Sequence, residues 1–180
     1  METPIITLHQ LSMRYSAEQD RIQFLFSSTE GAEHRVWLTR RFVKLMWKAL
    51  MGIVERHPDM GAGFEPHVRD AVLGMQHQES VQSLNVTTTQ TPTKSSETAE
   101  PDASPLLVTG CTSRMEKSGK AVSLELIIQG GDNIRFRLNK EILHSLFHLL
   151  IQSTIEVEWD LGLQVGDPHV VVDKQKPVVH

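Results

Sequence analysis

The chain has 180 residues, of which 39% are hydrophobic and 22% are charged, and its formal net charge is −4. This composition is ordinary for a folded domain, and the acidic balance argues against a protein whose main task is to neutralise phosphates. No apolar run reaches the ~18 residues of a membrane span, and the N-terminus has no signal-peptide pattern. We therefore expect a cytoplasmic protein without a membrane partner.

The chain repeats itself at an offset of 100 residues, without a gap, from about residue 5 to residue 54. The stretch Arg35–Val43 aligns with Arg135–Leu143, so that arginine meets arginine and apolar residues meet apolar residues. Thr39 meets Asn139 at the point where each copy should begin a helix. A unit of about 50 residues buries only a marginal core alone, so the two copies are expected to share one.

The first unit, residues 1–57, is predicted to hold three strands and a helix. Residues 6–15 form the first strand, and Ile22, Phe24 and Phe26 alternate with polar residues in the second, as in a sheet with one buried face. A turn at Gly31 leads into the third strand, at 35–38. Thr39 is a suitable N-cap for the amphipathic helix that follows, whose wide apolar stripe suggests a contact with the other helix or with another subunit.

The connector between the units divides into two parts. Residues 58–78 contain a short helix that Pro66 opens and that ends near Gln76. Residues 79–104 hold 11 Ser or Thr among 26 residues and no aromatic residue. Such a segment cannot bury enough apolar surface to offset its ordering entropy, so we predict that it is disordered.

The second unit, residues 105–163, repeats the pattern. Strands are predicted at 106–115, 122–126 and 134–138, followed by a helix that Asn139 caps. Ile155, Val157 and Trp159 then alternate with acidic residues, which predicts an extra strand. Residues 164–180 are expected to form a loose tail.

These patterns predict an α+β fold: an internal duplication of a βββα unit, with antiparallel strands, a pseudo-twofold axis and a long disordered linker between the copies. The strands would form one continuous sheet or two facing sheets, with the helices on one side. In fold alone, this arrangement resembles the Whirly and PUR single-stranded nucleic-acid binders. Their repeats have four strands before the helix, where this chain has three.

The outward face of the sheet is the first candidate binding surface. Basic residues beside an aromatic side chain can follow phosphates and stack a base. The other interpretation is that the arginines are solubilising cross-strand partners of nearby glutamates. The candidate residues are Arg14, Arg21, Arg35 and Trp37 in the first unit and Arg114, Arg135 and Arg137 in the second.

A second candidate is a metal site on the second helix. His144 and His148 are one turn apart, and Glu141 lies on the same face, so the imidazoles could reach one divalent ion. The aligned residues in the first helix, Lys44 and Lys48, belong in water. We therefore expect a solvent-facing polar stripe here rather than a metal site, and we expect no cofactor.

No catalytic or phosphate-binding motif is present, and no small-molecule substrate is evident. The leading expectation is a non-catalytic binding or scaffold module that acts through protein–protein contacts or through self-association as a homodimer. Exposed sheet edges and wide apolar helix faces favour it. The alternative is a single-stranded nucleic-acid-binding protein that uses the basic outer sheet face.

Overall fold

The computed structural model describes residues 5–56, 63–87 and 105–166. Their elements, in chain order, are β1 (Ile5–Ser16), β2 (Arg21–Ser28), β3 (Glu33–Leu38), α1 (Arg40–Val54), α2 (Pro66–Thr87), β4 (Leu106–Met115), β5 (Ala121–Ile128), β6 (Ile134–Asn139) and α3 (Lys140–Glu156). The fold class is therefore α+β, as predicted.

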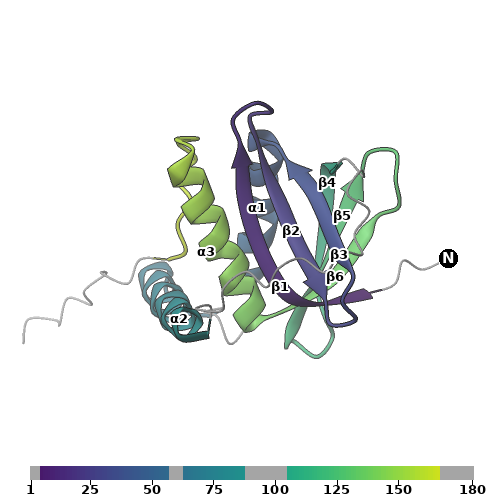
Figure 1. Cartoon of the computed structure of the whole chain (residues 1–180). Coiled ribbons are helices and arrows are strands. Elements are labelled where there is room, and N and C mark those ends of the chain that lie inside the picture. Colours follow the sequence, from purple (N-terminus) through teal and green to yellow (C-terminus); the bar gives the residue numbers. More distant parts are fainter. Residues whose placement is uncertain (1–4, 57–62, 88–104, 167–180) are drawn as a thin grey trace, which may run out of the picture.

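The six strands form one mixed sheet that closes into a barrel in the order β1-β2-β3-β4-β5-β6 (Figure 1). Pairing is antiparallel within each half of the chain, and two short parallel pairings, β3 with β4 and β1 with β6, join the halves. One continuous sheet was one of the two predicted arrangements and is the one that forms, but its parallel junctions and its closure into a barrel were not predicted. Because closure pairs each of these strands on both sides, the expected exposed sheet edges are absent from the described part of the chain.

The two halves use the same strand register. Leu8 pairs with Ser28 and Val108 pairs with Ile128, and each ladder is interrupted by a bulge at the next position. Across the second ladder of each half, Ile22 pairs with Leu38 as Val122 pairs with Leu138. Equivalent residues of the two halves therefore occupy equivalent places in the barrel.

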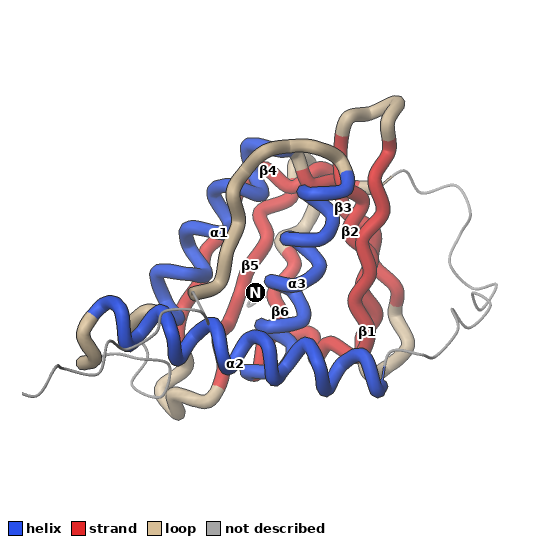
Figure 2. Tube along the Cα trace, turned by 90° about the vertical axis from the view of Figure 1, so that its left-hand side faces the viewer, coloured by secondary structure: helices blue, strands red, loops and turns tan. Residues whose placement is uncertain are grey.

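Helices α1 and α3 lie on the same side of the barrel (Figures 1 and 2). As predicted, Thr39 and Asn139 cap them, each accepting a hydrogen bond from a first-turn amide. The Trp47 ring of α1 meets the Phe147 ring of α3 at a centroid distance of 4.9 Å, edge to face. One continuous hydrophobic core thus joins the barrel interior and both helices.

Helix α2 starts at Pro66, as predicted, and lies across α3 (Figure 2). It continues to Thr87, well past the expected end near Gln76. The prediction of disorder for 79–104 is therefore wrong over 79–87, where the chain continues the helix in spite of its polar composition. Residues 88–104 lie outside the described part of the chain.

The predicted extra strand after α3 does not form. Helix α3 continues to Glu156, and Glu158 adopts a left-handed φ of +54°. The Trp159 amide then donates to the Thr154 carbonyl and the Glu158 amide to the Ile155 carbonyl, which is a Schellman helix end. The alternating pattern thus reflected a helix end with exposed Ile155 and buried Trp159, not a strand.

Residues after this helix end pack back on the protein. Val165 is buried in the core, so the predicted loose tail is wrong for 164–166. Residues 167–180 lie outside the described part of the chain.

Candidate functional site

The structure places the predicted sheet-face residues on the outside of the barrel. Arg14, Gln23 and Trp37 are successive partners across β1, β2 and β3. In the second half, Arg114 and Arg137 are the outer members of the same kind of row. The face forms as the strand parity predicted, but it curves around a barrel instead of forming an open sheet.

Glutamates pair with several of these arginines. Arg135 contacts Glu125 at 3.3 Å and Arg137 contacts Glu116 at 2.7 Å, while Arg35 lies 3.9 Å from Glu33. Burial alone would raise the pKa of Glu125, but hydrogen bonds from Arg135, Asn133 and Thr112, together with the charge of Arg135, outweigh it and lower that pKa.

The remaining arginines of the predicted face have no such partner. Among the ion pairs between described residues, none involves Arg14, Arg21 or Arg114. The arginines of the barrel face without an ion pair therefore lie on β1, β2 and β4, whereas both arginines of β6 are paired.

The predicted polar stripe on α3 is only partly in solvent. Glu141 is exposed, but His144 is 0% exposed because α2 covers it, so its expected solvent position is wrong. Within the described ranges, no group of three or more His, Cys, Asp or Glu side chains is arranged to hold a metal ion.

His144 instead contacts His77 of α2, with the two Nδ1 atoms 3.2 Å apart. Burial, the charge of His77 and the charge of Lys140 together lower the pKa of His144 to about 4. Burial and the charge of His148 also lower the pKa of His77. The Nε2 atom of His144 is buried and finds no hydrogen-bond partner among the described residues.

Helix α1 presents a cationic surface that contains an apolar residue. Arg41, Lys44, Leu45 and Lys48 follow helical spacing along its outer side, and we call these four residues the α1 outer face. The helix contains no acidic residue, and none of the ion pairs between described residues involves this face. Leu45 is 47% exposed in the middle of the three cations.

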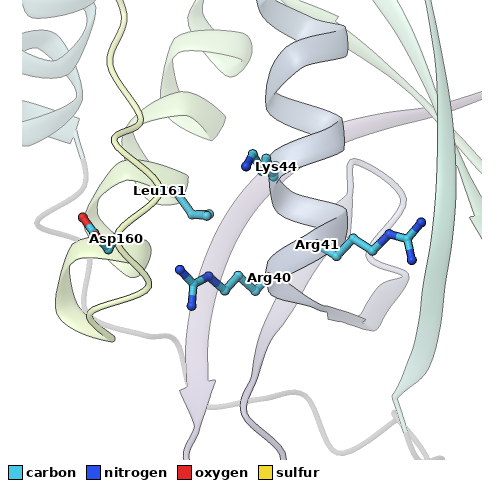
Figure 3. A pocket seen from close by; sticks show the side chains of 5 residues that line it. All are labelled: Arg40, Arg41, Lys44, Asp160 and Leu161. Atoms are coloured by element: carbon cyan, nitrogen blue, oxygen red, sulfur yellow. The ribbon is translucent and has the colours of Figure 1, made fainter.

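A recess of about 450 Å³ adjoins this face (Figure 3). Arg40 and Lys44 point toward the segment after α3 that carries Asp160 and Leu161, whereas Arg41 points away from it. The recess thus offers two cations and an apolar side chain, with Asp160 as the only acidic group in its lining.

The equivalent face of α3 is partly covered, because His144 is buried and residues 145 and 148 are half-buried, although Glu141 is exposed. Residues 141, 144, 145 and 148 occupy on α3 the places of the α1 outer face, and α2 packs on that helix. The contact places Leu73 and His77 of α2 in buried or half-buried positions. The α1 outer face is therefore the uncovered counterpart of a surface that the same fold partly covers elsewhere.

Lys44 and Lys48 were predicted only to face water, and no role was predicted for Arg41 or His77. Helix α1 has four cationic residues, no acidic residue and a leucine between the cations, and this pattern could have indicated the α1 outer face. The spacing of Leu73 and His77, one turn apart, could have indicated the buried side of α2.

Comparison with known proteins gave no match: no family model, curated protein or solved structure resembles this chain. In the part that the structure describes, no helix has both the length and the apolar character needed to cross a bilayer.

Proposed function

We propose that the chain is a non-catalytic binding module that docks an acidic, partly apolar protein segment on the α1 outer face. The segment belongs to a partner protein or to a second copy of the chain. The observation that carries the proposal is the exposed Leu45 among Arg41, Lys44 and Lys48, on a helix face whose counterpart on α3 is partly covered.

The two kinds of side chain would contribute in different ways. The three cations would speed the encounter with an acidic segment and make it sensitive to salt. Leu45 would supply apolar area that is removed from water on docking, worth about 1 kcal/mol for a half-exposed leucine. A surface that combines cations with an apolar side chain suits an amphipathic protein segment better than a nucleic acid, because this face offers no aromatic ring for a base to stack on.

Site-specific photo-crosslinking tests the proposal. A benzophenone side chain replaces Leu45 in one variant and Ile155, which is 67% exposed on α3, in a matched control. We expect a discrete protein adduct at position 45 that is absent at position 155 and is lost when Lys44→Glu and Lys48→Glu are added. An adduct with a second copy of the chain identifies self-association.

Two results would contradict the proposal. One is the same set of adducts at positions 45 and 155, which would mean that any exposed apolar position captures its surroundings. The other is an adduct at position 45 that disappears after nuclease treatment, which would assign the face to nucleic acid.

Single-stranded nucleic-acid binding is the alternative, and one observation favours it. Arg14 lies in the same row as Trp37 on the outer barrel face and has no ion-pair partner among the described residues. Fluorescence anisotropy with a labelled oligonucleotide should then show salt-sensitive binding that Arg14→Glu weakens and Arg135→Glu leaves nearly unchanged. Equal affinity for both variants would count against this alternative.

We also propose that the two halves are copies of one βββα unit related by a pseudo-twofold axis. The identical registers and the bulges one hundred residues apart support it. A circular permutant that opens the chain within 88–104 and joins the original termini should keep a single cooperative unfolding transition. Loss of that transition would argue against equivalent units.

A further inference from the structure

Helix α2 is held on α3 by few groups. Leu73 is the only large hydrophobic side chain that is buried among those described on α2, while Met75 is exposed. The polar contact between the helices is the His77–His144 pair, whose Nδ1 atoms face each other at 3.2 Å. An element with so few buried contacts opens at a lower free-energy cost than the core.

The facing nitrogens constrain how many protons the pair can hold. One Nδ1 atom must donate and the other must accept, so the contact holds one proton between them. A second proton between the two Nδ1 atoms would make two N–H groups point at each other, and neither could accept a hydrogen bond. A charge on His144 also lacks compensation, because its Nε2 atom is buried without a hydrogen-bond partner among the described residues.

Among the residues that the structure describes, no acidic group offsets such a charge. The groups whose charges act on the pair are Lys140 and His148, both on α3, and no group from β1 or β6, the strands on which α3 packs, contributes. The nearest acidic residues along the two helices, Glu79 and Glu141, are exposed. Protonation therefore adds positive charge to a site that already contains positive charge.

Helix α1 provides an internal comparison for the effect of positive charge at these helix positions. Lys44 and Lys48 occupy on α1 the places that His144 and His148 occupy on α3. These permanent cations are exposed, whereas the imidazole of His144 is buried under α2. In this fold the covered position carries a side chain that can be neutral.

We propose that α2 is a pH-sensitive cover over α3, which the neutral His77–His144 contact holds closed and which opens when both imidazoles are protonated. The inference is independent of the function proposed for the α1 outer face, since it concerns a different helix.

The pH window follows from His144, whose pKa is about 4 in the closed form and 6.5 ordinarily. Because the closed form binds the proton more weakly, falling pH favours opening from about 6.5 downward, and the effect levels off below about 4. At pH 4.5, His144 alone should increase the opening equilibrium by about 70-fold over its value at about pH 7.5.

Hydrogen–deuterium exchange of the full chain tests this proposal, with EDTA present so that no divalent ion bridges the imidazoles. We compare protection factors, which correct for intrinsic exchange, at about pH 7.5 and about pH 4.5. Protection of the α2 amides should fall by about 70-fold or more at the lower pH, while the amides of β2 and β5 stay protected.

Three variants make the result specific. The double variant His77→Phe/His144→Phe keeps ring volume and removes both proton sites, so its α2 should stay closed at both pH values. His144→Lys places a permanent cation under α2, which should be open even at about pH 7.5. His67→Phe removes an exposed imidazole from the first turn of α2 and should leave the wild-type pH response intact.

The proposal is overturned if α2 is equally protected at both pH values in the wild type. It is also overturned if the double phenylalanine variant loses protection at low pH as the wild type does. If His144→Lys also loses protection in β2 and β5, that variant has unfolded. The result with the double phenylalanine variant then tests the proposal.

Discussion

The carboxylate of Asp20 accepts a hydrogen bond from the indole Nε1 of Trp159, 3.1 Å away, although 139 residues separate the two along the chain. Tyr15 donates to the same oxygen at 2.8 Å, and its ring meets the Trp159 ring edge to face. Asp20 thereby ties the turn between β1 and β2 to the segment after α3. This segment also forms one wall of the recess beside α1.

Replacing Trp159 by Phe should lower the free energy of unfolding by about 1–2 kcal/mol, because the buried ring is largely kept while its hydrogen bond to a carboxylate is lost. Tyr15→Phe is the matched control, since it removes one donor to the same oxygen at an exposed position and should lower the free energy of unfolding by less than Trp159→Phe does. Urea denaturation measures both. Equal costs would show that the tether to Trp159 adds nothing.

The same carboxylate should make stability depend on acid pH. Hydrogen bonds from Tyr15 and Trp159 lower the pKa of Asp20 below its ordinary 3.8. Its contribution is therefore fully present above 3.8 and is lost as pH falls through the folded-state value. The stability difference between the wild type and Asp20→Asn should be constant at neutral pH and shrink in strong acid. A difference that does not change with pH would contradict this assignment.

Two glycines of the segment after α3 form a matched pair. Gly162 and Gly166 have similar left-handed φ values, +59° and +57°, but only at Gly166 would a Cβ atom collide with the Asp70 carbonyl oxygen of α2. Gly162→Ala should therefore cost about 1 kcal/mol, for the backbone conformation alone.

Gly166→Ala should cost about 2 kcal/mol more and loosen α2, because the backbones must separate. Thermal unfolding measures the loss of stability, and hydrogen exchange of the α2 amides measures the loosening of α2. Equal effects for the two substitutions would mean that the segment does not hold α2.

The contact between Trp47 and Phe147 should behave as a coupled pair. In a double-mutant cycle with Trp47→Leu and Phe147→Leu, we expect a coupling energy of about 0.5–1.5 kcal/mol for the edge-to-face rings. The control cycle pairs Phe147→Leu with Trp37→Leu on the outer barrel face, which should be additive within about 0.5 kcal/mol. Similar coupling in both cycles would argue against a specific ring contact.

Local pattern was sufficient to predict the six strands that form and the starts of the three helices. The alternation of Ile22, Phe24 and Phe26 predicted a strand in which those three residues are buried, together with Ser28, and Thr39 predicted the start of α1. Barrel closure could not be predicted in this way. It depends on parallel pairings of two or three residues, such as Val36 with Leu106, which connect distant segments and leave no periodic signal.

The errors have a common physical cause, which is tertiary contact. His144 was assigned to solvent because its aligned partner is Lys44, but the two halves differ in whether a helix covers them. Trp159 was assigned to a strand because it alternates with acidic residues, whereas a left-handed turn at Glu158 folds it back onto Asp20. In both cases, the deciding partner lies far away in the sequence.

The most direct test of the proposed function is NMR mapping of backbone amides during titration with the protein that crosslinks to position 45. If the partner docks on the α1 outer face, the largest chemical-shift changes should fall on Arg41–Lys48, and Leu45→Ser should weaken binding by about tenfold. Shifts confined to the barrel rows around Arg14 and Trp37, with α1 unchanged, would contradict it and move the binding surface to the sheet.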